Sequence, residues 1–437
     1  RLGRRCAVSA FFGIAAFNIS GKTLHSLLKL PIRGKHQCEL KGTALLRVQE
    51  AFSDVPYLII DEYSVIGQAL FGWIDRRCRQ VTGYLDIPFG GLNVILVGDP
   101  AQLPPVGDNV LNYPFPSNSV STQGYLAYQL FKTVVKLEVN QRSLGQIQEQ
   151  KEFRDILINL RNGESTVDDW KLLLTRKVPE DVSCLDSYVK LSFSNEEVNR
   201  DNYHSLKKLG EPIARIDAIH STSQGKKLSA EDIGGLEPTI YLALGARVML
   251  TKNIWPEKGL CNGSMGYVKH IVYKEGESPP SLPMAVIVKF DKGYVGPSFD
   301  HNENNLVPIT PQACTSESLG EEHERQQLPL KLAWSITIHK SQGLTIDKAW
   351  VNLGSKESCA GLAYVALSRV RALKDLFVDP MTFERLTAVS KGTNFCYRIE
   401  EEKRLTELST LTKQRFHSSN SEPSLVDIEQ DGLPIPI

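Results

Sequence analysis

Two adjacent carboxylates, Asp61 and Glu62, directly follow the apolar run Leu-Ile-Ile at 58–60. This run lacks the polar alternation of a half-exposed strand, so it predicts a strand buried on both faces, as in the parallel sheet of an α/β domain. Ligands of such sheets bind at the carboxyl ends of the strands. An Asp at that place can hold magnesium on the phosphates of a nucleotide, and a neighbouring Glu can accept a proton from the attacking water. The alternative interpretation is a surface turn after a core strand.

A second apolar run, 94–97, ends in the same way at Asp99 and leads into the proline-rich loop 100–105. Glycine and proline end the strand and stiffen this loop. The loop presents Gln102 as a neutral side chain that could contact a γ-phosphate or the water beside it, although a turn with an incidental Gln is the simpler interpretation. Two strands that each end in an acid-bearing loop, followed by Asn-Gln-Arg at 140–142, favour a nucleotide-driven motor.

Length and composition limit the class of protein. A chain of 437 residues is expected to form about two to four domains. The 50 Lys and Arg balance the 50 Asp and Glu, so any binding to nucleic acid must come from a local basic groove. The 8 cysteines lack the close Cys/His pairing of a zinc site, which is typical of reduced thiols in an intracellular protein. No run approaches the roughly 20 apolar residues of a membrane span, so no membrane contact is expected.

The tripeptide Gly21-Lys22-Thr23 invites assignment as a phosphate loop. That motif needs a glycine five residues before the Gly-Lys pair, and Ala16 occupies this position, so the cradle of backbone donors is not specified. We interpret Thr23 and His25 instead as donors that line a groove for a nucleic-acid backbone, with simple helix capping as the alternative.

Apolar periodicity locates the elements that must position these residues. It predicts helices over 66–86 and 146–175, a strand over 132–139, and a strand over 188–194 that opens a second α/β domain. A further strand of that second domain is expected over 246–251.

The sequence changes in character after residue 259. Short strands separated by Pro- and Gly-rich turns between 267 and 309 predict a small β-barrel inserted into the second domain, and the polar residues 312–327 are expected to form its exit linker. The chain then returns to the sheet, where an apolar strand ends in the polar cluster 339–343, and a helix over 360–371 presents Arg369. The first α/β domain is expected over 1–143. The second is expected in two parts, 144–258 and 312–392, on either side of the insertion at 259–311. A charged helix with a disordered tail is expected over 393–437.

The assembled motifs resemble the Pif (petite integration frequency) family of superfamily 1 DNA helicases, with RecD-like helicases as more distant relatives. The resemblance runs from about residue 7 to residue 382, over ordered blocks at plausible spacing. These blocks are Gly-Ile-Ala-Ala-Phe-Asn-Ile at 13–19, Thr-Leu-His-Ser at 23–26, Ile-Asp-Glu at 60–62, Gly-Asp-Pro-Ala-Gln-Leu-Pro-Pro at 98–105, Asn-Gln-Arg at 140–142, Asn-Gly-Ser-Met-Gly at 262–266, Ile-His-Lys-Ser-Gln-Gly at 338–343 and Tyr-Val-Ala-Leu-Ser-Arg at 364–369.

The resemblance implies a fold and roles for single residues. The fold would be α/β, with two RecA-like P-loop NTPase-type parallel-sheet domains that clamp ATP and Mg²⁺, a small β-barrel in the second, and single-stranded DNA across both. By this resemblance, Asp61 is similar to the family's carboxylate that binds magnesium, and Glu62 to the base that accepts a proton from water. Gln102 is similar to the residue that senses the γ-phosphate, and Arg142 and Arg369 to arginine fingers. For Arg369 the alternative is a salt bridge on a helix surface. The resemblance further implies that Gln342 and Gly343 contact the nucleotide. It implies that six residues contact DNA: Gly13, Thr23, His25, His339, Lys340 and Ser341.

The function implied is an ATP-dependent DNA helicase that moves 5′ to 3′ on single strands, acts at duplex junctions and serves DNA repair, recombination and telomere maintenance. It would be a monomer or a DNA-induced dimer, in the nucleus or the mitochondrion of a eukaryote. Two departures qualify this expectation. The family's phosphate loop, the Walker A loop, is absent, and Pro-Thr is replaced by Phe11-Phe12, which removes a hydroxyl contact to DNA. We therefore expect a truncated chain that is inactive alone, or else a nucleic-acid-binding pseudoenzyme or the helicase part of a transposon replication protein.

Overall fold

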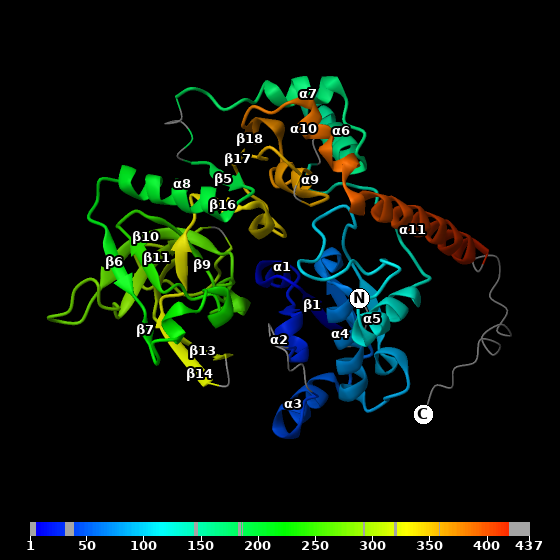
Figure 1. Cartoon of the computed structure of the whole chain (residues 1–437), viewed down its shortest axis with the longest axis horizontal. Coiled ribbons are helices and arrows are strands. Elements are labelled where there is room, and N and C mark those ends of the chain that lie inside the picture. Colours follow the sequence, from blue (N-terminus) through cyan, green and yellow to red (C-terminus); the bar gives the residue numbers. More distant parts are fainter. Residues whose placement is uncertain are drawn as a thin grey trace.

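The computed structural model describes residues 6–30, 39–143, 147–181, 185, 187–291, 293–318, 321–357 and 359–418. Its first domain is built on a parallel sheet of order β2-β1-β3-β4, of which β1 is labelled in Figure 1. The strands are β1 (Cys6–Ala10), β2 (Lys22–Thr23), β3 (Tyr57–Asp61) and β4 (Asn93–Leu96). The helices are α1 (Gly13–Asn18), α2 (Leu24–Leu28), α3 (Gly42–Phe52), α4 (Gln68–Thr82) and α5 (Ser119–Gln129).

The strand β3 enters the core because its apolar side chains are covered by α4. Leu58 and Ile60 are fully buried, and burial of such a side chain stabilises the fold by about 1.5–3 kcal/mol. Phe71 and Ile74 place one face of α4 in the same core, at the spacing that a helix requires. The predicted strand forms as β3 and ends at the two carboxylates, but it is not buried equally on both faces, because Leu58 and Ile60 are buried whereas Ile59 is half-buried.

Two side-chain and backbone features delimit α4. Asp108 accepts hydrogen bonds through Oδ2 from the backbone N–H groups of Ala69 at 2.9 Å and Leu70 at 3.4 Å, which satisfies donors at the start of the helix. Gly83, at φ 82°, ends the helix in the left-handed conformation that glycine adopts without strain. These caps fix α4 directly behind the loop that carries Asp61 and Glu62.

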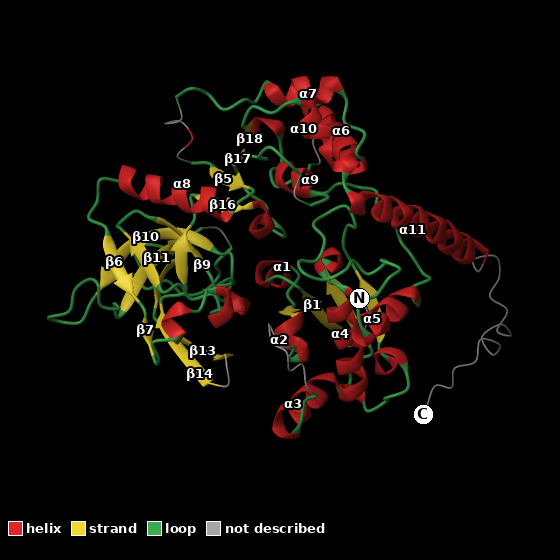
Figure 2. Ribbon diagram, in the orientation of Figure 1, coloured by secondary structure: helices red, strands yellow, loops and turns green. Residues whose placement is uncertain are grey.

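The second domain has its own parallel sheet of order β16-β5-β17-β18. Its strands are β5 (Val189–Ser192), β16 (Ser335–Thr337), β17 (Ala349–Val351) and β18 (Leu376–Val378). Its helices are α6 (Gln148–Asn162), α7 (Val167–Leu174), α8 (Asn195–Lys208), α9 (Leu362–Leu367) and α10 (Phe383–Leu386). The two parallel sheets confirm the expected α/β fold class, and Figure 2 separates them from the strand-rich region around β9.

Antiparallel strands form the insertion in the second domain. A five-stranded sheet has the order β12-β11-β10-β9-β15, beside a three-stranded sheet β13-β14-β7 and the pair β6-β8. The strands are β6 (Ala214–Asp217), β7 (Ile219–His220), β8 (Thr239–Leu242), β9 (Arg247–Leu250), β10 (Met265–Val272), β11 (Ala285–Phe290), β12 (Leu306–Ile309), β13 (Gln312–Ser318), β14 (Glu321–Gln327) and β15 (Leu330–Leu332). The antiparallel pairing thus extends beyond the expected 259–311.

Of two sequence predictions about this region, one is confirmed and one is wrong. The strand expected over 246–251 forms as β9, which pairs antiparallel with β10 and β15. The expected linker 312–327 is a hairpin, because β13 pairs with β14 along its length and β14 continues the sheet to β7. Its polar composition fits a ladder with few buried side chains, which hydrophobic periodicity does not detect.

The strand predicted over 132–139 is also absent from the structure. Its apolar residues are exposed, 74% for Val135 and 83% for Leu137. The segment runs beside the last helix, α11 (Thr393–Ser418), where the backbone N–H of Val134 donates to Thr412 Oγ1 at 3.0 Å. Because β4 is the edge strand of its sheet and this segment does not pair with it, the apolar alternation alone did not suffice to form a ladder.

The C-terminal part agrees with the expected charged helix as far as residue 418. The expected disordered tail lies outside the described residues. Within the described part of the chain, no helix has the length and apolar content needed to cross a membrane.

Candidate functional site

The turn after β3 places Asp61 and Glu62 at the carboxyl edge of the first sheet. Glu62 has φ 57° and ψ 44°, a left-handed conformation that non-glycine residues rarely adopt. The backbone around it is held by a hydrogen bond from Glu62 N to Asp61 Oδ1 at 2.8 Å and one from Tyr63 N to Val97 O at 3.1 Å. Such a conformation costs about 1–3 kcal/mol and is concentrated at functional sites.

Glu62 also makes a contact between the two parallel-sheet domains. Gln342, which follows β16, donates through Nε2 to Glu62 Oε2 at 3.2 Å. Burial is the largest influence and raises the pKa of Glu62; the bond from Gln342 lowers it, Asp61 raises it, and Arg369 and Arg142 lower it. Burial likewise raises the pKa of Asp61. A carboxylate with a raised pKa is a better proton acceptor, as a general base requires.

Arg369 lies inside the second domain, two residues after α9. Only 2% of it is exposed, and it donates through Nε to Val365 O at 2.7 Å and through Nη2 to Ser368 Oγ at 2.8 Å. Its Nη1 donates to Ser341 O and Leu344 O, both at 3.4 Å. Burial lowers its pKa to about 10, so it remains a cation at neutral pH. This burial contradicts the alternative of a salt bridge on a helix surface.

Arg142 and Gln102 approach the same region from the first domain. Arg142 donates through Nη1 to Ser368 O at 2.8 Å, directly beside Arg369 in sequence. The loop of Gln102 packs against the start of α9 at Gly361: a Cβ there would lie 2.4 Å from Ala101 O and 2.9 Å from Gln102 O. Only glycine, at φ 91°, permits this approach. The structure thus brings the two arginines, Gln102, Gln342 and Glu62 to one interface.

The chemistry of these interface residues fits a nucleoside triphosphate. Two buried amide oxygens, Gln102 Oε1 and Gln342 Oε1, have no hydrogen-bond partner in the described structure and could orient a water molecule. Two cations and a base are among the groups that phosphoryl transfer uses. The described residues include no cluster of three His, Cys, Asp or Glu side chains that could hold a metal. A magnesium ion would therefore have Asp61, with phosphate oxygens and waters as its other ligands, as this ion usually does.

The assignment of a phosphate loop to Gly21-Lys22-Thr23 finds no support. Lys22 is exposed on the edge strand β2, and β1 separates it from β3, which places it roughly 10 Å from Asp61 at the usual strand spacing. Thr23 caps α2, because its Oγ1 accepts a hydrogen bond from Ser26 N at 3.3 Å. Helix capping, the alternative role for Thr23, is thus observed.

The expected DNA-binding residues lie around α1 and on the turn after β16. His25 is half-buried with its ring edge-on to Phe11, at 5.6 Å between centroids, and burial lowers its pKa. Burial also lowers the pKa of the half-buried His339, whereas Lys340 is exposed. Ser341 differs from the expectation, because its side chain is fully buried and donates to Ile338 O at 2.7 Å, away from solvent.

Gly13 and Gly343 are the two expected ligand-contacting glycines, and both pack closely against neighbouring elements. A Cβ at Gly13 would lie 2.3 Å from Asn253 Oδ1 in the insertion. A Cβ at Gly343, at φ 77°, would lie 3.3 Å from Ala15 Cβ on α1. The helix α1 therefore contacts both the second domain and its insertion.

Sequence reasoning missed a group of charged residues at the domain interface. Arg161, on α6, donates through Nη2 to Asp99 Oδ1 at 2.7 Å and through Nη1 to Glu402 Oε2 on α11 at 2.9 Å. Tyr364 donates through its hydroxyl to Asp99 Oδ2 at 3.2 Å. The pKa of Arg161 is raised, because these hydrogen bonds and charges outweigh its burial. Asp99 and Tyr364 stand in motifs of the sequence analysis, but no motif indicates Arg161 or Glu402, which lie far from them in the sequence.

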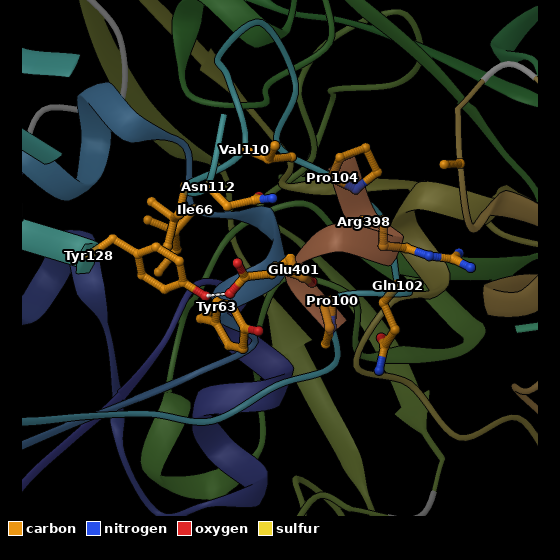
Figure 3. Close-up of a pocket in the computed structure, with 13 residues that line it drawn as sticks. Tyr63, Ile66, Pro100, Gln102, Pro104, Val110, Asn112, Tyr128, Arg398 and Glu401 are labelled. Carbon is orange, nitrogen blue, oxygen red and sulfur yellow. Dashed lines mark hydrogen bonds between the residues drawn. The ribbon is translucent and has the colours of Figure 1, made fainter. Parts of the chain in front are cut away.

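A small pocket of about 60 Å³ lies between α11 and the loops that follow β3 and β4 (Figure 3). Tyr63, Gln102 and Arg398 are among the residues that line it. On its wall, Tyr128 donates to Glu401 Oε1 at 2.6 Å, shown as a dashed line in Figure 3. The C-terminal helix is therefore part of the wall beside the candidate nucleotide site.

Comparison with known proteins agrees with the motifs. Residues 3–170 match the family model described as PIF1-like helicase, and residues 238–271 match the DNA helicase Pif1 2B domain. The chain is 30% identical to the ATP-dependent DNA helicase PIF1 of Xenopus laevis, covering 92% of this chain and 59% of that protein. It is 31% identical to the human protein of the same name, covering 85% and 54% respectively. The chain thus spans a little over half of these relatives.

Solved structures extend the similarity to the fold. A structure of two coordinating Pif1 helicases at forked duplex DNA matches with a TM-score of 0.66 and 30% identity over 88% of this chain and 84% of that one. The Bacteroides Pif1 in complex with ADP-AlF3 and single-stranded DNA matches with a TM-score of 0.68 and 28% identity over 92% and 88%. These matches, together with the motifs and the two parallel sheets, show that the chain belongs to the PIF1-like helicase family.

Proposed function

We propose that this chain supplies the motor of an ATP-dependent DNA helicase that moves 5′ to 3′ along single-stranded DNA and opens duplex junctions. The observation that carries the proposal is the bond between Gln342 and Glu62, which joins the two parallel-sheet domains at the point where Arg142 and Arg369 also meet. A nucleotide bound at such an interface would couple hydrolysis to movement of one domain against the other. The names of the relatives support the same activity.

Each residue has a distinct part in the proposed reaction. ATP would supply the phosphoryl group that is transferred, and Mg²⁺ would neutralise the negative charge of its phosphates. Asp61 would hold the Mg²⁺ ion. Glu62 takes the proton of the attacking water at its carboxylate, which burial makes more basic. Gln102 and Gln342 orient that water through the amide oxygens that have no other partner in the described structure. Arg142 and Arg369 face the developing negative charge, an effect worth roughly a thousandfold or more in related reactions.

The DNA path would cross α1 and the exposed Lys340, with His25 and His339 at its sides. A neutral protein needs such a local groove to bind phosphates, so its affinity for single strands should fall steeply with salt. DNA repair, recombination and telomere maintenance are the settings that we propose for the activity.

A duplex with a single-stranded tail on one side tests the proposal. With the full-length natural protein, ATP and Mg²⁺, we expect separation of a 5′-tailed duplex and little of a 3′-tailed one. Glu62→Gln should abolish unwinding and lower DNA-stimulated hydrolysis by at least about a hundredfold, because the amide cannot accept the proton. Glu50→Gln, on the exposed face of α3, is the matched control. Equal unwinding of both tails, or hydrolysis that persists in Glu62→Gln, contradicts the proposal.

A second function is favoured by one observation on the described residues. None of the four strands of the first sheet is followed by a glycine-rich loop carrying a Lys, so no phosphate cradle is present among them. A chain that binds single-stranded DNA without hydrolysing ATP would fit this observation. The two functions differ in ATP turnover and not in DNA binding.

A further inference from the structure

The tryptophan at position 255 is distinguished from the others by its exposure. The chain has 5 tryptophans, all among the described residues, and 41% of Trp255 is exposed whereas the other four are partly buried. Trp255 follows the exposed Ile254 in the segment 252–262, which joins β9 to β10 and includes the 3₁₀ turn Pro256–Lys258. An exposed indole offers a flat aromatic face on which a base can stack.

The backbone of this segment is rigid although its side chains face outward. The N–H groups of Ile254 and Trp255 both donate to Leu260 O, at 2.9 and 3.1 Å, and Leu260 N donates back to Trp255 O at 3.1 Å. Leu260 is 1% exposed and belongs to the core of the insertion. The indole is therefore presented from a fixed support, which lowers the entropic cost of stacking a ligand on it.

Two contacts attach the segment to α1. The Gly13 backbone lies against the Asn253 amide, and the Phe17 ring lies against Gly259, where a Cβ would be 3.2 Å from Phe17 Cζ. Asn253 is held in place, because its Oδ1 accepts a hydrogen bond from Asn262 N at 2.8 Å. Figure 1 shows α1 on the side of the first domain that faces the domain with β9.

The opposite end of the proposed groove also meets α1, through the contact of Gly343 with Ala15. A strand of nucleic acid that passes Lys340 and crosses α1 would consequently reach the segment 252–262. We propose that this segment is a third wall of the single-stranded DNA groove and that Trp255 stacks on a base there, flanked by the exposed amides of Asn253 and Asn262. The inference rests on the proposed DNA binding and adds to it a named stacking site.

The charges of the segment indicate which kind of contact it makes. The segment has two Lys and one Glu, a net charge of +1, and Lys252 donates through Nζ to Cys314 Sγ at 2.7 Å, so the segment adds little to the attraction of phosphates. Stacking on an aromatic ring instead tolerates every base and neutralises no phosphate, so it adds little to the salt dependence of binding. Substitution of Trp255 should therefore change the affinity for single strands without changing its salt dependence.

Tryptophan fluorescence and binding of an oligothymidylate to the full chain test the proposal together. We expect the oligonucleotide to quench the fluorescence of the unmodified chain. Trp255→Ala should weaken binding by roughly 5- to 150-fold, the range for loss of one stacked base, with the slope of log affinity against log salt unchanged. Trp255→Phe should retain most of the affinity and lose most of the quenching, because the ring remains and the fluorophore does not.

Tyr84→Ala is the matched control, since this exposed aromatic follows α4 at the opposite edge of the first sheet. It should leave both affinity and quenching unchanged. Trp255→Ala with unchanged affinity, or quenching that persists in Trp255→Phe, overturns the stacking site while DNA binding by the chain stands. An unmodified chain that does not bind the oligonucleotide overturns the proposed function and the stacking site with it.

Discussion

At the scale of single residues, the conformation of the candidate site lowers the stability of the folded chain. Glu62 combines a left-handed backbone with a half-buried carboxylate, and both features are unfavourable in the folded chain. The compensation comes from neighbours, since Gln342 donates to the carboxylate and Val97 O fixes the backbone of the next residue. Strain of this kind is expected where a base must be positioned and kept reactive.

This cost leads to a prediction about stability. The pKa of Glu62 is raised in the folded chain, so its contribution to stability is favourable below the ordinary Glu pKa of 4.5 and is lost as pH rises through the folded value. Glu62→Gln removes a charge that is unfavourable at neutral pH. We expect the variant to melt at a higher temperature than the unmodified chain at pH 7.5, with the difference shrinking toward pH 4. A variant that melts lower at pH 7.5 contradicts this.

At the scale of elements, α11 connects the candidate site to the first domain. Glu401 and Glu402 follow each other on α11 but face different partners, Tyr128 of α5 for the first and Arg161 of α6 for the second. Arg404 adds a second bond to Glu401 from the same helix, at 2.7 Å. The helix thus contacts both parallel-sheet domains, and its docking depends on a few buried polar contacts.

The phenol of Tyr128 is the contact that can be removed most cleanly. Tyr128→Phe deletes the hydroxyl that donates to the buried Glu401, which should loosen α11 by about 1–3 kcal/mol. Backbone amides of α11 should then exchange with deuterium roughly tenfold faster or more. Tyr125→Phe, on the same helix α5, is the control, since the Tyr125 hydroxyl makes no hydrogen bond to the described part of α11. Equal exchange in the two variants would show that this bond does not hold the helix.

Elements also show what sequence could and could not predict. The ends of β3 and β4 were predicted because an apolar run that stops at an acid is a local signal. The segment 132–139 has the same apolar alternation and still forms no strand, because a ladder also needs a partner edge that no local pattern specifies. The hairpin β13–β14 is the converse case, a paired element without an apolar pattern. Arg161 had no signal, since its partners are set by the tertiary fold.

At the scale of the whole molecule, several contacts of the candidate site cross between the two parallel-sheet domains. Gln342 reaches Glu62, Arg142 reaches Ser368, and Arg161 reaches Asp99. Opening the two domains would separate Glu62 from Gln342 and from the charge of Arg369, and Arg142 from Ser368. In the proposed reaction, hydrolysis would therefore require the closed arrangement of the two domains.

The arrangement predicts how the chain of residues 1–437 behaves. Asp61 and Glu62 can serve a metal and a water, but the β- and γ-phosphates also need backbone donors and a Lys, and the described residues offer no such cradle near β3. We expect the purified chain to bind single-stranded DNA with salt-sensitive affinity and to show little or no DNA-stimulated ATPase. Lys22→Ala should change neither property much, because Lys22 is exposed on β2 with β1 between it and β3. Magnesium-dependent ATPase that is lost in Lys22→Ala would show instead that Gly21-Lys22-Thr23 is a phosphate loop.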